Sequence, residues 1–197
     1  DAQSLLNVTE GALSEVHTIL LRMCELAVQS SNDTVRDQDR DVLQMEVAQL
    51  EAEIQRISDD TTWSGMTLLA GGFSTGATFQ IGPRDTDTIQ ISIAAIDATT
   101  AAQLALSSHV STQAAAQDYI ATIDNAILKI SEQRGKYGAT MNRLDHAMAN
   151  MQNIVTNLST AKGRLEDADF AAESANLART QVLQQASMAM LSQANAS

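Results

Sequence analysis

A single helical seam with a seven-residue repeat runs through the second half of the chain. Apolar residues recur at alternating steps of four and three, and only one member of the seam is charged. The members are Ala116, Ile120, Ile123, Ile127, Ile130, Arg134, Tyr137, Met141, Leu144, Met148, Met151, Val155 and Leu158. A repeat sustained this long predicts one long helix that packs lengthwise against other helices. Over residues 112–158 such a helix would be roughly 70 Å long.

Two segments in the first half of the chain show the same alternation of four and three. They predict a helix over about residues 2–31 and another over about residues 36–58. Their seams are Ala12, Val16, Ile19, Met23 and Leu26, and Leu43, Val47, Leu50, Ile54 and Ile57. Because all three seams share one repeat, we expect a mainly α fold, an antiparallel rod of long helices packed as in a coiled coil.

The segment between the second and the long helix has a different period. Residues 78–81 and 88–93 alternate between apolar and polar side chains, and a Gly-Pro-Arg-Asp turn lies between them. This pattern predicts a β-hairpin over about residues 78–93. An isolated hairpin is marginal in water, so Ile89, Ile91 and Ile93 are expected to contact the helices. A polar connection follows over residues 94–111, with a short helix expected at 100–107.

The end of the chain predicts a further helix whose apolar residues have no partner. The long helix is expected to end near residue 162, and a spacer with Asp167 and Asp169 leads to a helix over about residues 170–194. Apolar side chains of this last helix are not confined to one stripe. They include Leu177, Val182, Leu183, Met190 and Leu191. Since no other segment remains to bury them, we expect them to pack against other copies of the chain.

Charge and composition exclude several classes of function. The net charge is −12, which makes nucleic acid and anionic membrane surfaces poor partners. No apolar run is long enough to predict a membrane span. The three histidines lie far apart, the single cysteine has no companion, and no phosphate-binding loop or nucleophile motif is present. We therefore expect no enzymatic activity, no metal site and no cofactor.

Arg134 is the one unusual member of the long seam. Its aliphatic stem could pack in the seam while the guanidinium reaches solvent. Alternatively, the guanidinium could pair with a carboxylate on the second helix and fix the register between helices. Both interpretations are compatible with the sequence.

Six stretches of the chain resemble bacterial flagellins. Residues 21–30 read LRMCELAVQS and follow EGAL at residues 10–13, as in the first conserved helix of that family. Residues 130–139 read ISEQRGKYGA, and residues 168–178 read ADFAAESANLA. Residues 181–186 and 190–195, QVLQQA and MLSQAN, continue the similarity to the C-terminal helices. The resemblance extends over nearly the whole chain.

The resemblance implies a subunit of the bacterial flagellar filament, secreted and located outside the cell. Residues 1–163 would form the rod domain called D1, and residues 164–197 the spoke and part of the C-terminal D0 helix. The family's N-terminal core helix and variable outer domains have no counterpart in this sequence. Implied partners are other flagellin subunits, the flagellar export chaperone and the cap protein.

The resemblance also implies recognition by the innate immune Toll-like receptor for flagellin. The matching positions are Arg22 and Leu26 on the first helix and Glu46 on the second. Arg22 and Leu26 are one turn apart, which predicts that they share a face. Leu50 replaces a basic residue that some recognised flagellins carry.

Two other kinds of protein, one structural and one signalling, fit parts of the same pattern. A flagellar hook–filament junction protein resembles flagellin at its ends. A signalling coiled coil of the chemoreceptor type shares the long heptads, but it would show two mirrored arms and no β-hairpin.

Overall fold

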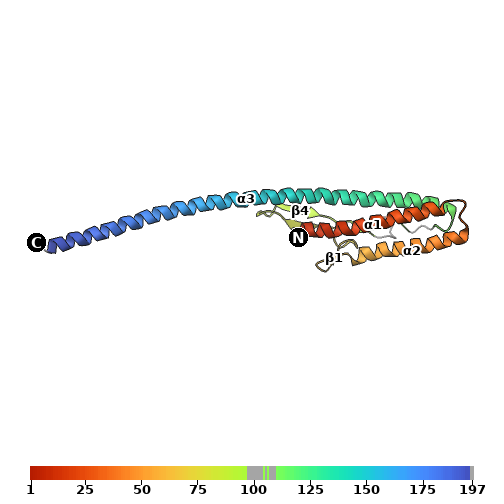
Figure 1. Ribbon diagram of the computed structural model, residues 1–197, viewed down its shortest axis with the longest axis horizontal. Coiled ribbons are helices and arrows are strands. Elements are labelled where there is room, and N and C mark those ends of the chain that lie inside the picture. The colour runs from red at the N-terminus through yellow and green to blue at the C-terminus, as the bar shows by residue number, and fades with distance from the viewer. Residues whose placement is uncertain (97–103, 105, 107–109, 196–197) are drawn as a thin grey trace. The chain divides into compact units, whose positions relative to one another are not determined.

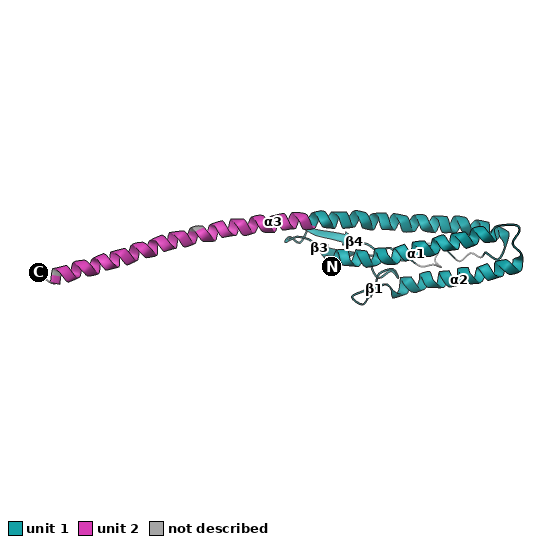
Figure 2. Cartoon of the chain, viewed as in Figure 1, with its two compact units in different colours: residues 1–147 teal, residues 148–197 magenta. Residues whose placement is uncertain are grey.

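The computed structural model describes residues 1–96, 104, 106 and 110–195. The chain divides into two compact units, Asp1–Ala147 and Met148–Ser197 (Figure 2). The short helix predicted at residues 100–107 falls almost entirely outside the described residues. The mainly α fold predicted from the heptads is confirmed, and both units are described separately below.

Helices α1 (Ala2–Ser30) and α2 (Asp37–Asp60) confirm the two helices predicted in the first half of the chain. In the first unit, α1 lies beside both α2 and the start of α3 (Figure 1). Its buried stripe is therefore wider than the predicted seam. Leu13 and Leu20, which the seam omits, are fully buried, whereas Ala12 and Ile19 are only partly buried.

Arg40 closes the turn between α1 and α2. Its side chain is 6% exposed and donates hydrogen bonds to the carbonyl oxygens of Ser30 and Asn32, each at 3.0 Å. It also forms an ion pair with Asp37 at 2.9 Å. The last carbonyl groups of a helix have no intrahelical donors, so a buried cation here satisfies them in place of a glycine cap.

Two β-hairpins follow α2. Strands β3 (Ala77–Gln80) and β4 (Thr88–Ile91) pair antiparallel with Phe79 opposite Ile89, which confirms the predicted hairpin. Ile89, Ile91 and Ile93 are buried, as expected.

A second, smaller hairpin was not expected from the sequence. Strands β1 (Thr62–Trp63) and β2 (Met66–Thr67) pair across a turn at Ser64 and Gly65, where φ is +51° and +80°. Positive φ at both central residues is typical of the tight turns that join hairpin strands. Two residues per strand are too few for an alternating pattern to reveal.

Helix α3 runs from Gln113 to Asn195 without a break, so the predicted end near residue 162 and the spacer after it are wrong. Gly163 is the main helix-weakening residue there, and one glycine costs only about 1 kcal/mol relative to alanine. The chain's single proline lies elsewhere, at position 83. Lys162 and Glu166 form an ion pair one turn apart across the predicted break.

Only the first part of the α3 seam is buried. Ala116, Ile123 and Ile130 are almost fully enclosed in the first unit, together with Tyr119, which lies off the predicted seam. Gln3, at the start of α1, donates to Asp145, so α1 covers α3 only as far as that level. The later seam residues Met148, Val155 and Leu158 are 52–64% exposed, so the prediction that they are buried within this chain is wrong.

Two buried tyrosines join α3 to the rest of the first unit. The Tyr119 hydroxyl donates to Glu51 Oε1 of α2 at 2.7 Å. Burial raises the pKa of Tyr119, and the hydrogen bond to Glu51 raises it further. Burial is also the main cause that raises the pKa of Tyr137 to about 12.

These tyrosines should make the fold less stable at high pH. Below pH 10, the ordinary value for tyrosine, both folded and unfolded phenols keep their protons and the stability is fully present. Between pH 10 and about 12 the unfolded phenols ionise while folded Tyr137 stays neutral, so the free energy of unfolding falls. Urea unfolding followed from pH 8 to 12 should show this loss, and Tyr137→Phe should reduce it. An equal loss in the variant would contradict the assignment.

Candidate interaction surfaces

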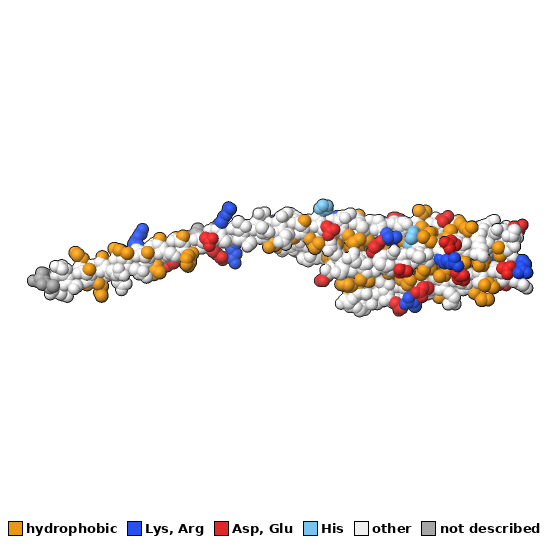
Figure 3. All heavy atoms as spheres, in the orientation of Figure 1, with side chains coloured by type: hydrophobic (Ala, Val, Ile, Leu, Met, Phe, Trp, Pro, Cys, Tyr) orange, Lys and Arg blue, Asp and Glu red, His pale blue; other side chains and the backbone are white. Residues whose placement is uncertain are grey.

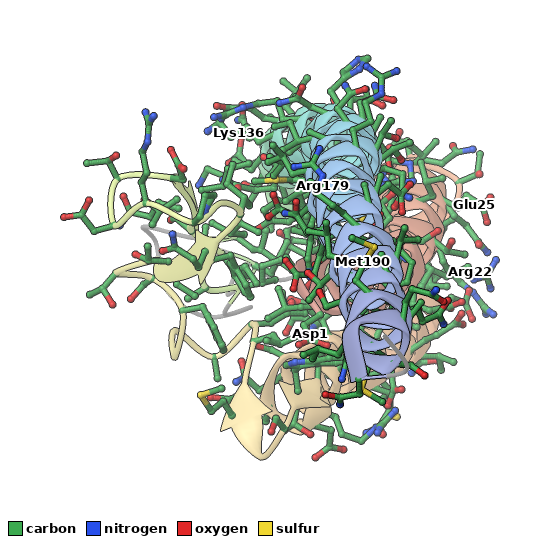
Figure 4. All side chains as sticks on the ribbon, turned by 90° about the vertical axis from the view of Figure 1, so that its left-hand side faces the viewer. Asp1, Arg22, Glu25, Lys136, Arg179 and Met190 are labelled. Atoms are coloured by element: carbon green, nitrogen blue, oxygen red, sulfur yellow. The ribbon has the colours of Figure 1, made fainter. Side chains whose placement is uncertain are left out.

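The five predicted packing residues of the last helix are all exposed in the single chain. Their exposed fractions range from 59% to 73%, and Met190 projects from the helix in Figure 4. Apolar side chains are scattered along the whole second unit in Figure 3. The exposed set comprises Leu177, Val182, Leu183, Met190 and Leu191.

The chemistry of this surface suits burial against other protein. Val182 and Leu183 are adjacent, as are Met190 and Leu191, so apolar groups point in more than one direction around the helix. Residues 180–197 contain no charged side chain. Burying one side chain of this size contributes about 1.5–3 kcal/mol, and no charge would have to be desolvated at the same time.

The predicted receptor-contact residues do not form one surface. Arg22 lies on the outside of the first unit, where it pairs with Glu46 at 2.8 Å and with Glu25 at 3.1 Å (Figure 4). The hydrogen bond with Glu46 raises the pKa of Arg22, whose guanidinium is charged in any case. Leu26 is only 1% exposed, so the prediction that it shares an accessible face with Arg22 is wrong. One helical turn places two residues near each other but does not decide which one faces the core.

Arg134 pairs with α1. Its Nε donates to Glu10 Oε1 at 2.7 Å, and the two side chains are 35% and 28% exposed. The guanidinium therefore does pair with a carboxylate, as one of the two interpretations held, but the carboxylate lies on α1 and not on the second helix. Glu10 Oε2 is buried with no hydrogen-bond partner among the described residues, and Arg134 provides the counter-charge to this carboxylate through Oε1.

Two contacts that orient α3 were missed by the sequence analysis. Glu10 and Glu51 both look like residues of a solvated helix face, yet they accept hydrogen bonds from Arg134 and Tyr119. The only sign of these two contacts in the sequence was that their donors, Arg134 and Tyr119, carry polar groups and lie in or next to the apolar seam of the long helix.

The described residues show no arrangement typical of catalysis. They contain no group of three or more His, Cys, Asp or Glu side chains that could hold a metal ion. A cavity of about 500 Å³ has Lys129 and Glu132 as the charged groups of its lining. No described helix combines the length and the apolar character that crossing a membrane requires.

The comparisons with known proteins decide the family. The profile of the bacterial flagellin N-terminal helical region matches residues 1–74, and that of the C-terminal helical region matches residues 120–197. A flagellin of Halalkalibacterium halodurans is 40% identical over 99% of this chain and 71% of its own length. This chain belongs to the bacterial flagellin family. A flagellar filament 31.3 kDa core protein of Treponema maltophilum is 35% identical over 98% of this chain and 72% of that protein.

Solved structures share the flagellin fold. The crystal structure of Bacillus cereus flagellin has a TM-score of 0.67 at 33% identity and covers 76% of this chain and 85% of that one. A protein of Vibrio parahaemolyticus, assigned provisionally to the flagellar hook-associated class, has a TM-score of 0.64 at 18% identity. It covers 78% of this chain and 82% of that one, and at this identity it shows the fold alone.

The Arg134–Glu10 pair should couple α3 to α1 in a double-mutant cycle. Arg134→Gln, Glu10→Gln and the double variant are expected to give a coupling of about 1 kcal/mol in urea unfolding, because both groups are partly shielded from solvent. The matched control is the more exposed Lys136–Glu132 pair within α3. A coupling no larger than that of the control would show that Arg134 merely extends its stem toward solvent.

Proposed function

We propose that this chain is a structural subunit of the bacterial flagellar filament that assembles with copies of itself outside the cell. Family membership excludes the chemoreceptor alternative. Relatives that match nearly the whole chain include a flagellin and a flagellar filament core protein, which favours the filament over the hook–filament junction. The function is mechanical support of motility, with no catalytic step.

One observation carries the proposal of self-assembly. The second unit is a helix whose large apolar side chains are exposed, and they surround the helix instead of lying on one stripe. Such a helix gains free energy only when other protein covers it on several sides. Other copies of the same helix offer a surface of the same length and chemistry. An export chaperone and a cap protein are further partners that we propose from the family resemblance.

Replacing apolar residues of the last helix should prevent filament growth. A variant with Leu177, Leu183 and Leu191 all changed to Gln would be expressed in a bacterium that lacks its own flagellin. Because these side chains are exposed in the single chain, the fold should persist while the apolar contacts are lost. We expect soluble protein in the medium and no filaments by electron microscopy.

The matched control changes three polar residues of the same helix, Gln181, Gln184 and Gln193, to Ser. Filaments of ordinary length should form with this variant. Filaments of equal length from the leucine variant would count against assembly through this helix, and protein retained inside the cell would count against secretion.

Recognition by the Toll-like receptor for flagellin is a second proposal, supported by the exposed Arg22–Glu46 pair. Arg22→Ala and Glu46→Ala are each expected to weaken activation of receptor-bearing reporter cells about tenfold, as for charged hot spots at interfaces. Arg56→Ala is the control, because Arg56 is a similarly exposed arginine in ion pairs on α2. Equal activation by all three variants would refute a contact at Arg22 and Glu46.

A further inference from the structure

Exposed acidic residues on α2 fall on one row with a spacing of seven. Their side chains are 42–65% exposed, and consecutive members lie two helical turns apart on the same face. This acidic row consists of Asp39, Glu46, Glu53 and Asp60. Each carboxylate already has an arginine partner in the same chain, but a carboxylate offers about four lone-pair sites and can accept a further cation.

Exposed cations on α3 follow the same spacing. This basic row consists of Lys129, Lys136 and Arg143, all exposed. Lys136 already pairs with Glu132 one turn before it, but an ammonium group has three donors and can serve a second carboxylate. Residues 1–147 hold 9 cations and 20 acidic side chains, a net charge of 9 − 20 = −11. Two copies of so acidic a unit repel each other in most orientations. An approach that brings a basic row to an acidic row is one of the few that electrostatics favours.

The two rows lie on different sides of the first unit. In Figure 4, Lys136 and Arg22 project on opposite sides of the view, and Arg22 bonds directly to Glu46 of the acidic row. A surface on one side that fits a surface on the other makes a head-to-tail contact, which repeats from copy to copy without closing into a dimer.

The heights of the rows along the helices determine how two copies would fit. Hydrogen bonds join Gln44 to Val110 and Glu51 to Tyr119, so α2 and α3 run in the same direction. Because Tyr119 is level with Glu51, a difference of 68, Lys129 is level with residue 61, directly after the end of α2. If two parallel copies lay side by side without a shift, Lys129 of one copy would meet Asp60 of the other, and the remaining members of the two rows would have no partner.

If one copy is shifted along the helix axis by 15 residues, Lys129 moves from the level of residue 61 to the level of Glu46 in the other copy. Three pairs of opposite charge are then aligned at once. At about 1.5 Å per residue this is a displacement of about 22 Å along the helix axes. The pairs are Lys129 with Glu46, Lys136 with Glu53, and Arg143 with Asp60.

We infer that the basic row of α3 is a lateral docking surface for the acidic row of a second copy, parallel to the first and displaced by about 22 Å. This inference rests on the proposed function and adds to it the orientation and stagger of neighbouring subunits. Each exposed ion pair is weak, so no single pair fixes the register between two copies. The register is set because only one stagger aligns all three pairs at the same time.

Cross-linking within assembled filaments tests the orientation directly. Lys129→Cys and Glu46→Cys are placed in one chain whose native Cys24 is changed to Ala, and a short bis-maleimide reagent is added. The two positions are 15 residues apart in height within one chain, so a short link must join two copies. The other two pairs of the rows are kept. Denaturing electrophoresis should show a ladder of dimers, trimers and longer products.

The control chain carries Lys129→Cys with Asp60→Cys, which would be brought together if the copies ran antiparallel or lay parallel without a shift. We expect no ladder from it. A ladder from this control, or none from the first chain although filaments form, would overturn the inference and leave the filament proposal intact. If the unmodified protein forms no filaments, the filament proposal itself fails, and the inference with it.

Neutralising the basic row gives a second, independent readout. Changing its three residues to Gln should raise the protein concentration needed for assembly about tenfold at low salt, and high salt should remove the difference. The control changes three exposed α3 residues outside the row, Gln117, Ser131 and Asn142, to Glu, which alters the net charge by the same −3. Circular dichroism checks that both variants are folded. An equal response of the two would show that net charge alone controls assembly and would overturn the inference.

Discussion

The two-sided burial of α1 is the constraint on which the first unit depends. Leu13, Leu20 and Met23 are fully enclosed because α2 lies beside one side of the helix and α3 beside the other. Polar contacts also fix both neighbours to α1. Arg40 ties the end of α1 to α2, and Arg134 ties α3 to Glu10 of α1. The hydrogen bond from Tyr119 to Glu51 joins α3 to α2 directly.

The sequence predicted the helices well because a seven-residue repeat reports directly that one face is apolar. It does not report what covers that face. The α3 seam is equally regular before and after Leu144, yet Ile130 is buried and Val155 is exposed. For the same reason the repeat could not show whether the Arg134 guanidinium pairs with a carboxylate, or that its partner is Glu10 of α1. The predicted break near Gly163 failed because one weak residue does not end a helix that continues well on both sides.

The candidate surfaces were predictable to different degrees. The packing residues of the last helix were predicted because no other segment of the chain remained to bury them. They are exposed in the single chain. Leu26 was misjudged because its seam position, which requires burial, conflicts with a role in surface contact. The sequence alone could not predict how the charged rows on α2 and α3 are matched in height. The hydrogen bond between Tyr119 and Glu51 fixes the relative height of the two helices.

The absence of charge after Arg179 has a consequence for how such an assembly would respond to its surroundings. Contacts made by uncharged apolar groups are nearly indifferent to pH and are strengthened by excluded salts. Contacts between charged rows weaken as ionic strength rises. The first units and the uncharged last part of α3, residues 180–197, would therefore respond to different properties of the medium. A rise in salinity would weaken the contacts between neighbouring first units while the contacts of residues 180–197 persist, so a filament would soften without coming apart.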